Sequence, residues 1–317
     1  SLWTNYCVSE SYEPGSTFKP VTVASALEEG VVKDGDTYVC KGFETVADYK
    51  LKCHVFSTIG SHGSLTVEQA LMNSCNPYMI HLALEMGNSR FAYYQSLFGF
   101  GKITGIDLPG ETTGIVYGDR MTTIDAACNS FGQTINVNMM QMMAAYCSII
   151  NGGMLYQPHI VKRIESANGE VVKEYKANLV RQTITASTSK LLRRYLKNTV
   201  EEGTAKKAGV TGYSVAGKTG TAQKGDRKDN KWIISFIGHA PAENPKFAIY
   251  VVIDEPYGTT GTSGSSADVL TLTHNILEKL LPYMNVYKDA SDEYEDTSSS
   301  PDELTVDGIP AGTASSN

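Results

Sequence analysis

Three short motifs combine hydroxyl, amine and amide side chains at spacings that suit acyl transfer. They are Ser16-x-x-Lys19, Ser74-x-Asn76 and Lys218-Thr219-Gly220. A serine hydroxyl is a weak nucleophile and needs a base beside it. Positions three apart share one face of a helix, so the first motif predicts Lys19 one turn from Ser16. We therefore expect a serine nucleophile with a lysine as its base.

This lysine base must be neutral for part of the time, because an ammonium group cannot accept a proton. Burial disfavours the charged form and lowers the pKa of an amine, and a second cation nearby lowers it further. We expect Lys218 to be that second cation. The partial positive charge at a helix start also favours the negative charge that develops on Ser16. The motifs therefore predict Lys19 buried near Lys218.

The second motif adds a hydroxyl and an amide, in a turn that follows a helix. Ser74 is expected to pass a proton between the lysine and a leaving amine. Asn76 is expected to fix both a substrate carbonyl and Lys19. The alternative is structural, since Ser74 and Asn76 could simply cap a helix that begins at Pro77.

The third motif is expected on an edge strand, where an extended peptide can pair with the main chain. Lys218, Thr219 and Thr221 then offer a cation and two hydroxyls to a terminal carboxylate. Gly220 lets another backbone approach closely. The backbone N–H groups of Ser16 and Thr221 are the expected oxyanion-hole donors, and losing one such donor costs about 10²–10³ in rate. The alternative is a glycine-containing strand end with a surface lysine.

The first two motifs lie in or next to segments whose sequence predicts helices. A helix is expected over residues 16–30. Thr66 and Gln69 form a capping-box pattern at a second helix start, and Asn76-Pro77 separates this helix from the next. Four more helices are expected from periodicity and their stop signals, over 77–86, 136–153, 185–203 and 266–284.

The third motif lies in a segment whose sequence predicts a strand. Three runs, over 214–224, 231–241 and 246–256, are strand-like, and the last two are joined by a proline-rich turn. Short connections between sequential strands predict an antiparallel meander. The stretch 31–63 is expected to be loop with short strands. Together with the helices, this predicts an α+β fold.

Composition excludes several classes of function. The chain has 317 residues, of which 41% are hydrophobic, and is therefore long enough to bury a core without a metal. Its formal net charge of −7 disfavours nucleic acid as a partner. No apolar run is long enough to span a bilayer, and the first residues lack the pattern of a signal peptide.

The six cysteines give a weaker signal. No C-x-x-C pair occurs, and the histidines lack a common ligand spacing, so zinc is not expected. Cys40 and Cys53 flank a stretch that reads as two brief strands around a turn. Their ends could meet in a disulfide, which spacing alone cannot decide. Most of the six cysteines are expected to be small buried hydrophobic residues.

Beyond the motifs, most of residues 1–284 resembles the transpeptidase domain of class B penicillin-binding proteins. The three motifs in this order are the known signature of that group and of class A β-lactamases. The branch of spore-forming Gram-positive bacteria and their relatives is the most similar. The resemblance is carried by SYEPGSTFKPVTVASALEEG, HGSLTVEQALMNSCNPYMIHLA, SFGQTINVNMMQMMAAYCSIINGGMLYQPHIVKRI, VEEGTAKKA and YSVAGKTGTAQK.

The resemblance implies a peptidoglycan D,D-transpeptidase that uses neither metal nor organic cofactor. Ser16 would form an acyl-enzyme with a stem peptide and release D-alanine, and β-lactams would acylate the same serine. Lys19, Ser74 and Asn76 would assist, while Lys218, Thr219 and Thr221 bind the carboxylate. The expected location is the extracytoplasmic face of the bacterial membrane, with membrane-embedded cell-wall synthesis proteins as partners.

The same resemblance implies that the chain is a catalytic domain followed by a tail, and that the domain lacks its first strands. Residues 1–287 would be the transpeptidase domain, with an antiparallel sheet flanked by helices and a mostly helical subdomain. Family members carry the first strands of the sheet upstream of the serine helix, and those strands have no counterpart here. We therefore expect the chain alone to be unstable or to aggregate. The acidic segment 288–317 is expected to be disordered.

Three rival functions remain open. A serine β-lactamase would need a group that activates water, and no glutamate stands in the matching context. A non-catalytic β-lactam sensor or scaffold would keep the fold without the chemistry, which three complete motifs disfavour. A Ser-His-Asp hydrolase is disfavoured because His81 and His239 lie in no motif.

Overall fold

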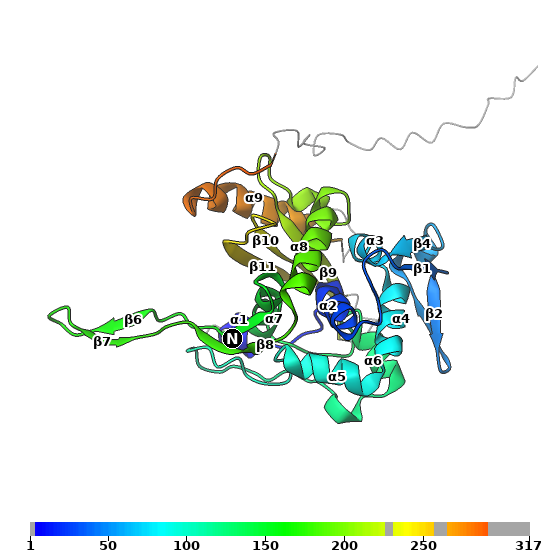
Figure 1. The fold of residues 1–317 in the computed structure, drawn as a ribbon, viewed down its shortest axis with the longest axis horizontal. Coiled ribbons are helices and arrows are strands. Elements are labelled where there is room, and N and C mark those ends of the chain that lie inside the picture. The colour runs from blue at the N-terminus through cyan, green and yellow to red at the C-terminus, as the bar shows by residue number, and fades with distance from the viewer. Residues whose placement is uncertain (1–3, 226–230, 257–264, 291–317) are drawn as a thin grey trace, which may run out of the picture.

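The computed structural model describes residues 4–225, 231–256 and 265–290 (Figure 1). Its main sheet has three antiparallel strands in the order β11-β10-β9, with bounds β9 (Ala216–Lys224), β10 (Lys231–Ala240) and β11 (Phe247–Asp254). This is the predicted meander. Within the described residues β11 pairs only with β10, so the expectation that the chain alone is unstable stays a prediction.

Both faces of β10 are covered, which explains its almost continuous apolar sequence. Side chains alternate between faces along a strand. Ile234 and Phe236 pack against α9 (Ala267–Tyr283), while Ile233 and Ile237 belong to the core around the helical part. The described parts of the chain therefore form an α+β fold with helices on both sides of the sheet, as expected (Figure 1).

The predicted nucleophile helix forms in two pieces. A 3₁₀ turn, η1 (Gly15–Phe18), leads directly into α2 (Lys19–Glu29). Every residue of α2 from Lys19 to Ala26 is buried, because the helix contacts α4, α7 and α8, while the preceding turn η1 contacts β9. A polar side chain at the start of this helix is therefore shielded from solvent.

The remaining helices are α1 (Tyr6–Ser9), α3 (Val67–Met72), α4 (Asn76–Met86), α5 (Asn88–Leu97), α6 (Thr123–Asn129), α7 (Met139–Ile150) and α8 (Ala186–Glu201), with short 3₁₀ turns η2 (His54–Ser57), η3 (Gly118–Arg120) and η4 (Lys206–Ala208). Among these helices, α3, α4, α7 and α8 lie within a few residues of the predicted ranges, whereas α1, α5 and α6 were not predicted from the sequence. The capping box of Thr66 and Gln69 forms as predicted. Helix α7 begins three residues later than expected, because Asn138 caps it and Asn136 and Val137 pair with other segments.

Short two-stranded sheets lie next to the helical part. They pair β1 (Thr37–Cys40) with β4 (Gly63–Thr66), β2 (Phe43–Val46) with β3 (Tyr49–Lys52), β5 (Met154–Gln157) with β8 (Asn178–Gln182), and β6 (Arg163–Glu165) with β7 (Val171–Glu174). The β2–β3 pair is the predicted hairpin between Cys40 and Cys53. The β6–β7 hairpin projects away from the rest of the molecule (Figure 1).

The acidic segment 288–317 is ordered at its start, contrary to expectation. The carboxylate of Asp289 accepts hydrogen bonds from the backbone N–H and the hydroxyl of Ser214, the former at 2.7 Å. The Asp289 N–H also donates to the carbonyl of Gly212. The rest of the predicted disordered segment, 291–317, lies outside the described residues. Among the residues that are described, none of the helices combines the length and apolar character needed to cross a membrane.

Candidate active site

The turn that carries Ser16 is packed tightly against the strand that carries Lys218. Gly220 has no room for a side chain, since a Cβ there would lie 2.8 Å from the Thr17 methyl group and 2.9 Å from the Pro14 carbonyl oxygen. On this face the neighbour of Gly220 is the nucleophile turn itself, so the glycine sets the distance between η1 and β9. The approach of a substrate backbone along the strand edge stays a prediction.

Two further glycines shape this turn. Gly15 has φ +56° and Gly132 has φ +81°, and the Gly15 N–H donates to the Gly132 carbonyl at 2.9 Å. A Cβ on Gly132 would lie 2.0 Å from the Gly15 oxygen. These positions combine left-handed backbone with close approach, which only glycine tolerates. The half-buried Ser16 therefore sits on a fixed backbone beside β9.

Lys19 joins the first two motifs through its amine. The side chain is fully buried, and Nζ donates to the Ser74 carbonyl at 2.6 Å, the Ser74 hydroxyl at 3.0 Å and Asn76 Oδ1 at 2.7 Å. A lysine ammonium has three donors, so all of them are used. The Ser16 hydroxyl is not among these partners.

The structural alternative for the second motif does not hold. The residue that caps α4 is Cys75, and no side chain accepts a capping hydrogen bond there. Ser74 has φ +54°, a left-handed conformation that is costly for a residue with a side chain. This backbone directs both the carbonyl and the hydroxyl of Ser74 to Lys19. The turn is therefore built around the lysine.

Burial dominates the electrostatics of both lysines. It lowers the pKa of Lys19 to about 8, against an opposing influence from Cys53 and Cys75. Burial, reinforced by the charge of Lys19, lowers the pKa of Lys218 well below its usual range. Both amines are buried as expected, but the pKa of Lys19 is lowered by burial alone, and Lys218 is not the second cation that lowers it.

The third motif lies on the free edge of the main sheet in the described part of the chain. Lys218 is fully buried, and its Nζ donates to the Thr219 carbonyl at 3.2 Å and hydroxyl at 3.3 Å. The Thr219 hydroxyl lies 3.4 Å from that of Thr204, which also donates to the Met72 carbonyl at the end of α3. Thr204 was not singled out from the sequence, because no motif marks it. It links the second and third motifs.

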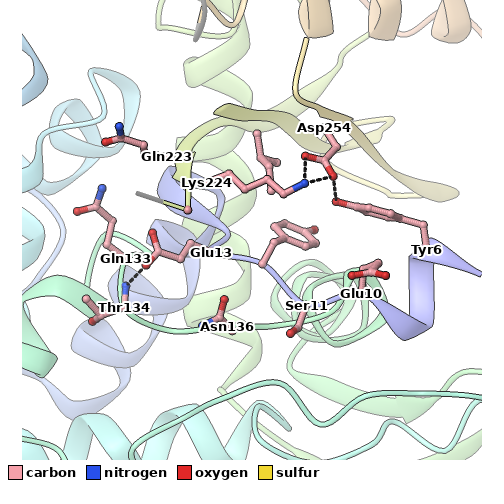
Figure 2. A pocket seen from close by; sticks show the side chains of 13 residues that line it. Tyr6, Glu10, Ser11, Glu13, Gln133, Thr134, Asn136, Gln223, Lys224 and Asp254 are labelled. Carbon is pink, nitrogen blue, oxygen red and sulfur yellow. Dashed lines mark hydrogen bonds and ion pairs between the residues drawn. The ribbon is translucent and has the colours of Figure 1, made fainter. Parts of the chain in front are cut away.

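The described pocket lies further along the same strand (Figure 2). It has a volume of about 650 Å³ and is lined by Gln223 and Lys224 of β9 together with residues from α1 and the segments after it. The Lys224 amine pairs with Asp254 at 2.8 Å, and the Tyr6 hydroxyl donates to the same carboxylate at 3.3 Å. None of Ser16, Lys19 or Lys218 lines it. The pocket therefore contains none of the motif residues named here, and we place the chemistry at Lys19.

The disulfide that the spacing permitted between Cys40 and Cys53 is absent, and both are free thiols. Their sulfur atoms approach the same nitrogen, His62 Nδ1, at 3.8 Å and 3.6 Å. The hairpin between the two cysteines forms as predicted, but it directs both thiols to the imidazole.

Comparison with known proteins agrees with this geometry. Residues 2–278 match the family model described as the penicillin binding protein transpeptidase domain. The chain is 41% identical over 288 residues to stage V sporulation protein D of Bacillus subtilis, covering 89% of this chain and 44% of that protein. It is 32% identical to peptidoglycan D,D-transpeptidase FtsI of Escherichia coli K12, covering 90% of this chain and 46% of that protein. The chain thus spans less than half the length of these relatives.

Solved structures give the same result. Penicillin-binding protein 3 of Mycobacterium tuberculosis in complex with ampicillin superposes with a TM-score of 0.81 at 29% identity, covering 91% of this chain and 66% of that one. The D,D-transpeptidase domain from Eggerthella lenta gives 0.75 at 27% identity, covering 88% of this chain and 68% of that one. Because the family model matches residues 2–278, which is most of its length, this chain belongs to the family of penicillin-binding protein transpeptidase domains.

Proposed function

We propose that this chain is the catalytic domain of a peptidoglycan D,D-transpeptidase that acts through a serine acyl-enzyme. The observation that supports this most directly is the hydrogen bonding of the buried Lys19 amine to Ser74 and Asn76. A lysine with a pKa near 8, one turn from a serine, has the proton affinity that a general base needs near neutral pH.

In the acylation step the Ser16 hydroxyl attacks the carbonyl of the penultimate D-alanine of a stem peptide. The hydroxyl proton moves to Lys19 as the new C–O bond forms. The backbone N–H groups of Ser16 and Thr221 stabilise the oxyanion. When the C–N bond breaks, Ser74 passes a proton from the lysine to the departing D-alanine amine. The product is an ester of Ser16 and free D-alanine.

In the second step an amino group of a neighbouring stem peptide attacks this ester. The acceptor loses a proton, the cross-linking amide forms, and Ser16 recovers its hydroxyl. Lys218, Thr219 and Thr221 hold the carboxylate of the donor peptide, or the carboxylate of a β-lactam that acylates Ser16. Stem peptides lie outside the cell, so we place the chain on the extracytoplasmic face of the membrane, with membrane-embedded cell-wall synthesis proteins as partners.

Mass spectrometry of the protein after benzylpenicillin treatment tests this function. We expect one adduct, located on Ser16, and no adduct on Ser16→Ala. The matched control is Ser11→Ala, a serine of the pocket in Figure 2, which should label as the wild type does. A folded wild type that stays unlabelled would exclude catalysis and favour a scaffold. Rapid turnover of a chromogenic cephalosporin would favour a β-lactamase.

A further inference from the structure

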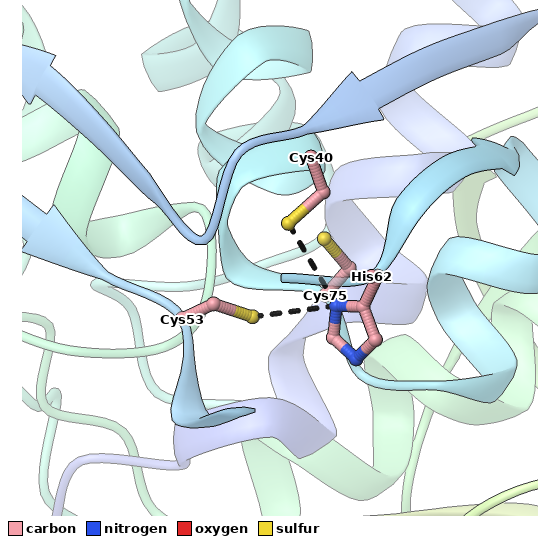
Figure 3. Close-up of side chains that lie close together, drawn as sticks. All are labelled: Cys40, Cys53, His62 and Cys75. Atoms are coloured by element: carbon pink, nitrogen blue, oxygen red, sulfur yellow. Dashed lines mark hydrogen bonds between the residues drawn. The ribbon is translucent and has the colours of Figure 1, made fainter. Parts of the chain in front are cut away.

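Four potential metal ligands converge behind the turn of the second motif. Cys40, Cys53, His62 and Cys75 place their ligand atoms within 4.8 Å of one another (Figure 3). All three cysteines are at most 3% exposed, and His62 is half-buried. We propose that this cluster is a structural zinc site, and that the bound ion fixes the turn that holds the catalytic lysine.

The distances fit tetrahedral zinc better than they fit hydrogen bonds. Zinc lies about 2.3 Å from sulfur and about 2.0–2.1 Å from nitrogen, so a tetrahedron has S···N edges of about 3.6 Å. The observed distances from His62 Nδ1 are 3.6 Å to Cys53 and 3.8 Å to Cys40. The Gly42 N–H donates to the Cys40 sulfur at 3.4 Å, a contact that would stabilise a thiolate.

The donor set identifies the metal and its role. Three thiolates and one imidazole form a Cys₃His site, and soft sulfur ligands select zinc over magnesium or calcium. Four protein ligands close the coordination sphere and leave no position for water. The ion would therefore cross-link the chain rather than take part in the chemistry. A disulfide between two of the cysteines would leave a third thiol and the imidazole of His62 without a role.

The ligands come from four separate segments, which is why sequence spacing gave no sign of zinc. Cys40 ends β1, Cys53 follows β3, His62 precedes β4 and Cys75 caps α4. The two small sheets that carry the first three ligands have four residues per strand. Such short hairpins are marginal on their own, so an added cross-link is valuable there.

Cys75 connects the site to catalysis because it is the middle residue of the second motif. Its neighbours Ser74 and Asn76 supply all three hydrogen bonds of the Lys19 amine. The Asn76 amide also donates to the carbonyl of Lys52, the residue before Cys53, at 3.4 Å. An ion bound to Cys53 and Cys75 therefore fixes both sides of this turn. This part of the inference rests on the proposed function.

Zinc content and penicillin acylation, measured on the same protein samples, test the proposal. The protein is purified under reducing conditions, and its metal content is determined by mass spectrometry. Zinc sulfate is then titrated into protein that has been stripped with a chelator. We expect one zinc per chain and slower benzylpenicillin acylation of the stripped protein, with recovery when zinc returns. Cobalt in place of zinc should give a thiolate-to-cobalt charge-transfer band.

Ligand variants separate this proposal from the proposed function. Cys40→Ser and His62→Ala should weaken zinc affinity by more than about 100-fold, beyond the loss typical of outer-shell changes, and should slow acylation. The matched control Cys7→Ser replaces an exposed cysteine outside the cluster and should change neither property. Ser16→Ala should keep its zinc while losing acylation, so failure of the catalytic proposal leaves the zinc result intact.

Three outcomes would overturn the zinc site. The wild type could fail to bind zinc stoichiometrically when reduced, Cys40→Ser could bind zinc as tightly as the wild type, or cobalt could show no thiolate band. Normal acylation by stripped protein would overturn the link to Lys19 even if zinc binds. If Cys40→Ser does not fold, the same question is decided with the wild type, by measuring zinc binding and acylation after the metal is removed and after it is restored.

Discussion

At the scale of single residues, the amine of Lys19 is the point where the first two motifs meet. A buried ammonium group has lost its contacts with water, and its hydrogen-bond acceptors compensate for that loss. A hydrogen bond to a charged group contributes about 1.5–3 kcal/mol, so removing one acceptor should be costly. We expect Asn76→Ala to misplace the amine and to slow benzylpenicillin acylation by about 10–100-fold. The control is Asn73→Ala, whose exposed amide bonds to the Gln69 carbonyl. Equal acylation rates for the two variants would remove Asn76 from the site.

The pH dependence of acylation follows from the same residue. Lys19 has a pKa of about 8, so at neutral pH only the minor, neutral fraction of the amine can act as a base. We expect the acylation rate to rise with pH and to level off above about 8. The charges of Cys53 and Cys75 raise this pKa and oppose the burial that lowers it. Lys19→Arg, which stays charged, should acylate slowly with no such rise. A wild-type rate that falls through this range would contradict a lysine base.

At the scale of elements, the contact between η1 and β9 decides whether Ser16 faces the third motif. In Gly220→Ala the new Cβ would meet the Ser235 hydroxyl oxygen at 2.5 Å and the Thr17 methyl group at 2.8 Å. Such overpacking costs about 1–3 kcal/mol and should push the two elements apart. We expect both thermal stability and acylation rate to fall.

A second glycine supplies the control for this prediction. Gly30 ends α2 with φ +76° and has open space around its Cα, so alanine there strains the backbone without a clash. Gly30→Ala should lower the melting temperature while the acylation rate per folded molecule stays near that of the wild type. Equal loss of acylation in both variants would show that Gly220 acts through stability alone.

Local sequence patterns predicted many of the helices and strands. They did not predict which residues from distant segments come together in the fold. Capping boxes and hairpin patterns place helix α3 and strands β2 and β3, because their causes lie within a few residues. The left-handed Ser74 had no local signal, since its backbone is held by contacts to Lys19. The cluster of Cys40, Cys53, His62 and Cys75 was missed for the same reason: each ligand looks ordinary in its own segment.

At the scale of the whole molecule, the site lies where two apolar cores meet. One core fills the helical part and reaches one face of the sheet, and the other packs α9 against the opposite face. The turn η1, which leads into α2, contacts β9, so the first motif belongs to the helical part and the third to the sheet. Interactions that tie the sheet to the helical part should therefore stabilise the site as well as the fold.

His239 is one such tie, since it connects β10 to α7 inside the protein. Its Nε2 lies 3.1 Å from the Ala242 carbonyl, which can only accept, so Nε2 carries the proton. Nδ1 then accepts from the Tyr146 hydroxyl at 2.8 Å. Burial lowers the pKa of His239 to about 4, with a smaller contribution from the charge of Arg193. The imidazole is therefore held neutral in the folded protein.

The stability of the fold should consequently fall in acid. In the unfolded chain a histidine binds its proton near pH 6.5, whereas folded His239 binds it only near 4, so the unfolded state takes up the proton first as pH drops. Between these values the free energy of unfolding should decrease by on the order of 3 kcal/mol. Urea unfolding at a series of pH values measures the decrease, and His239→Gln should abolish most of it. A wild type whose stability is flat over this range would show that burial does not keep His239 neutral in the folded protein.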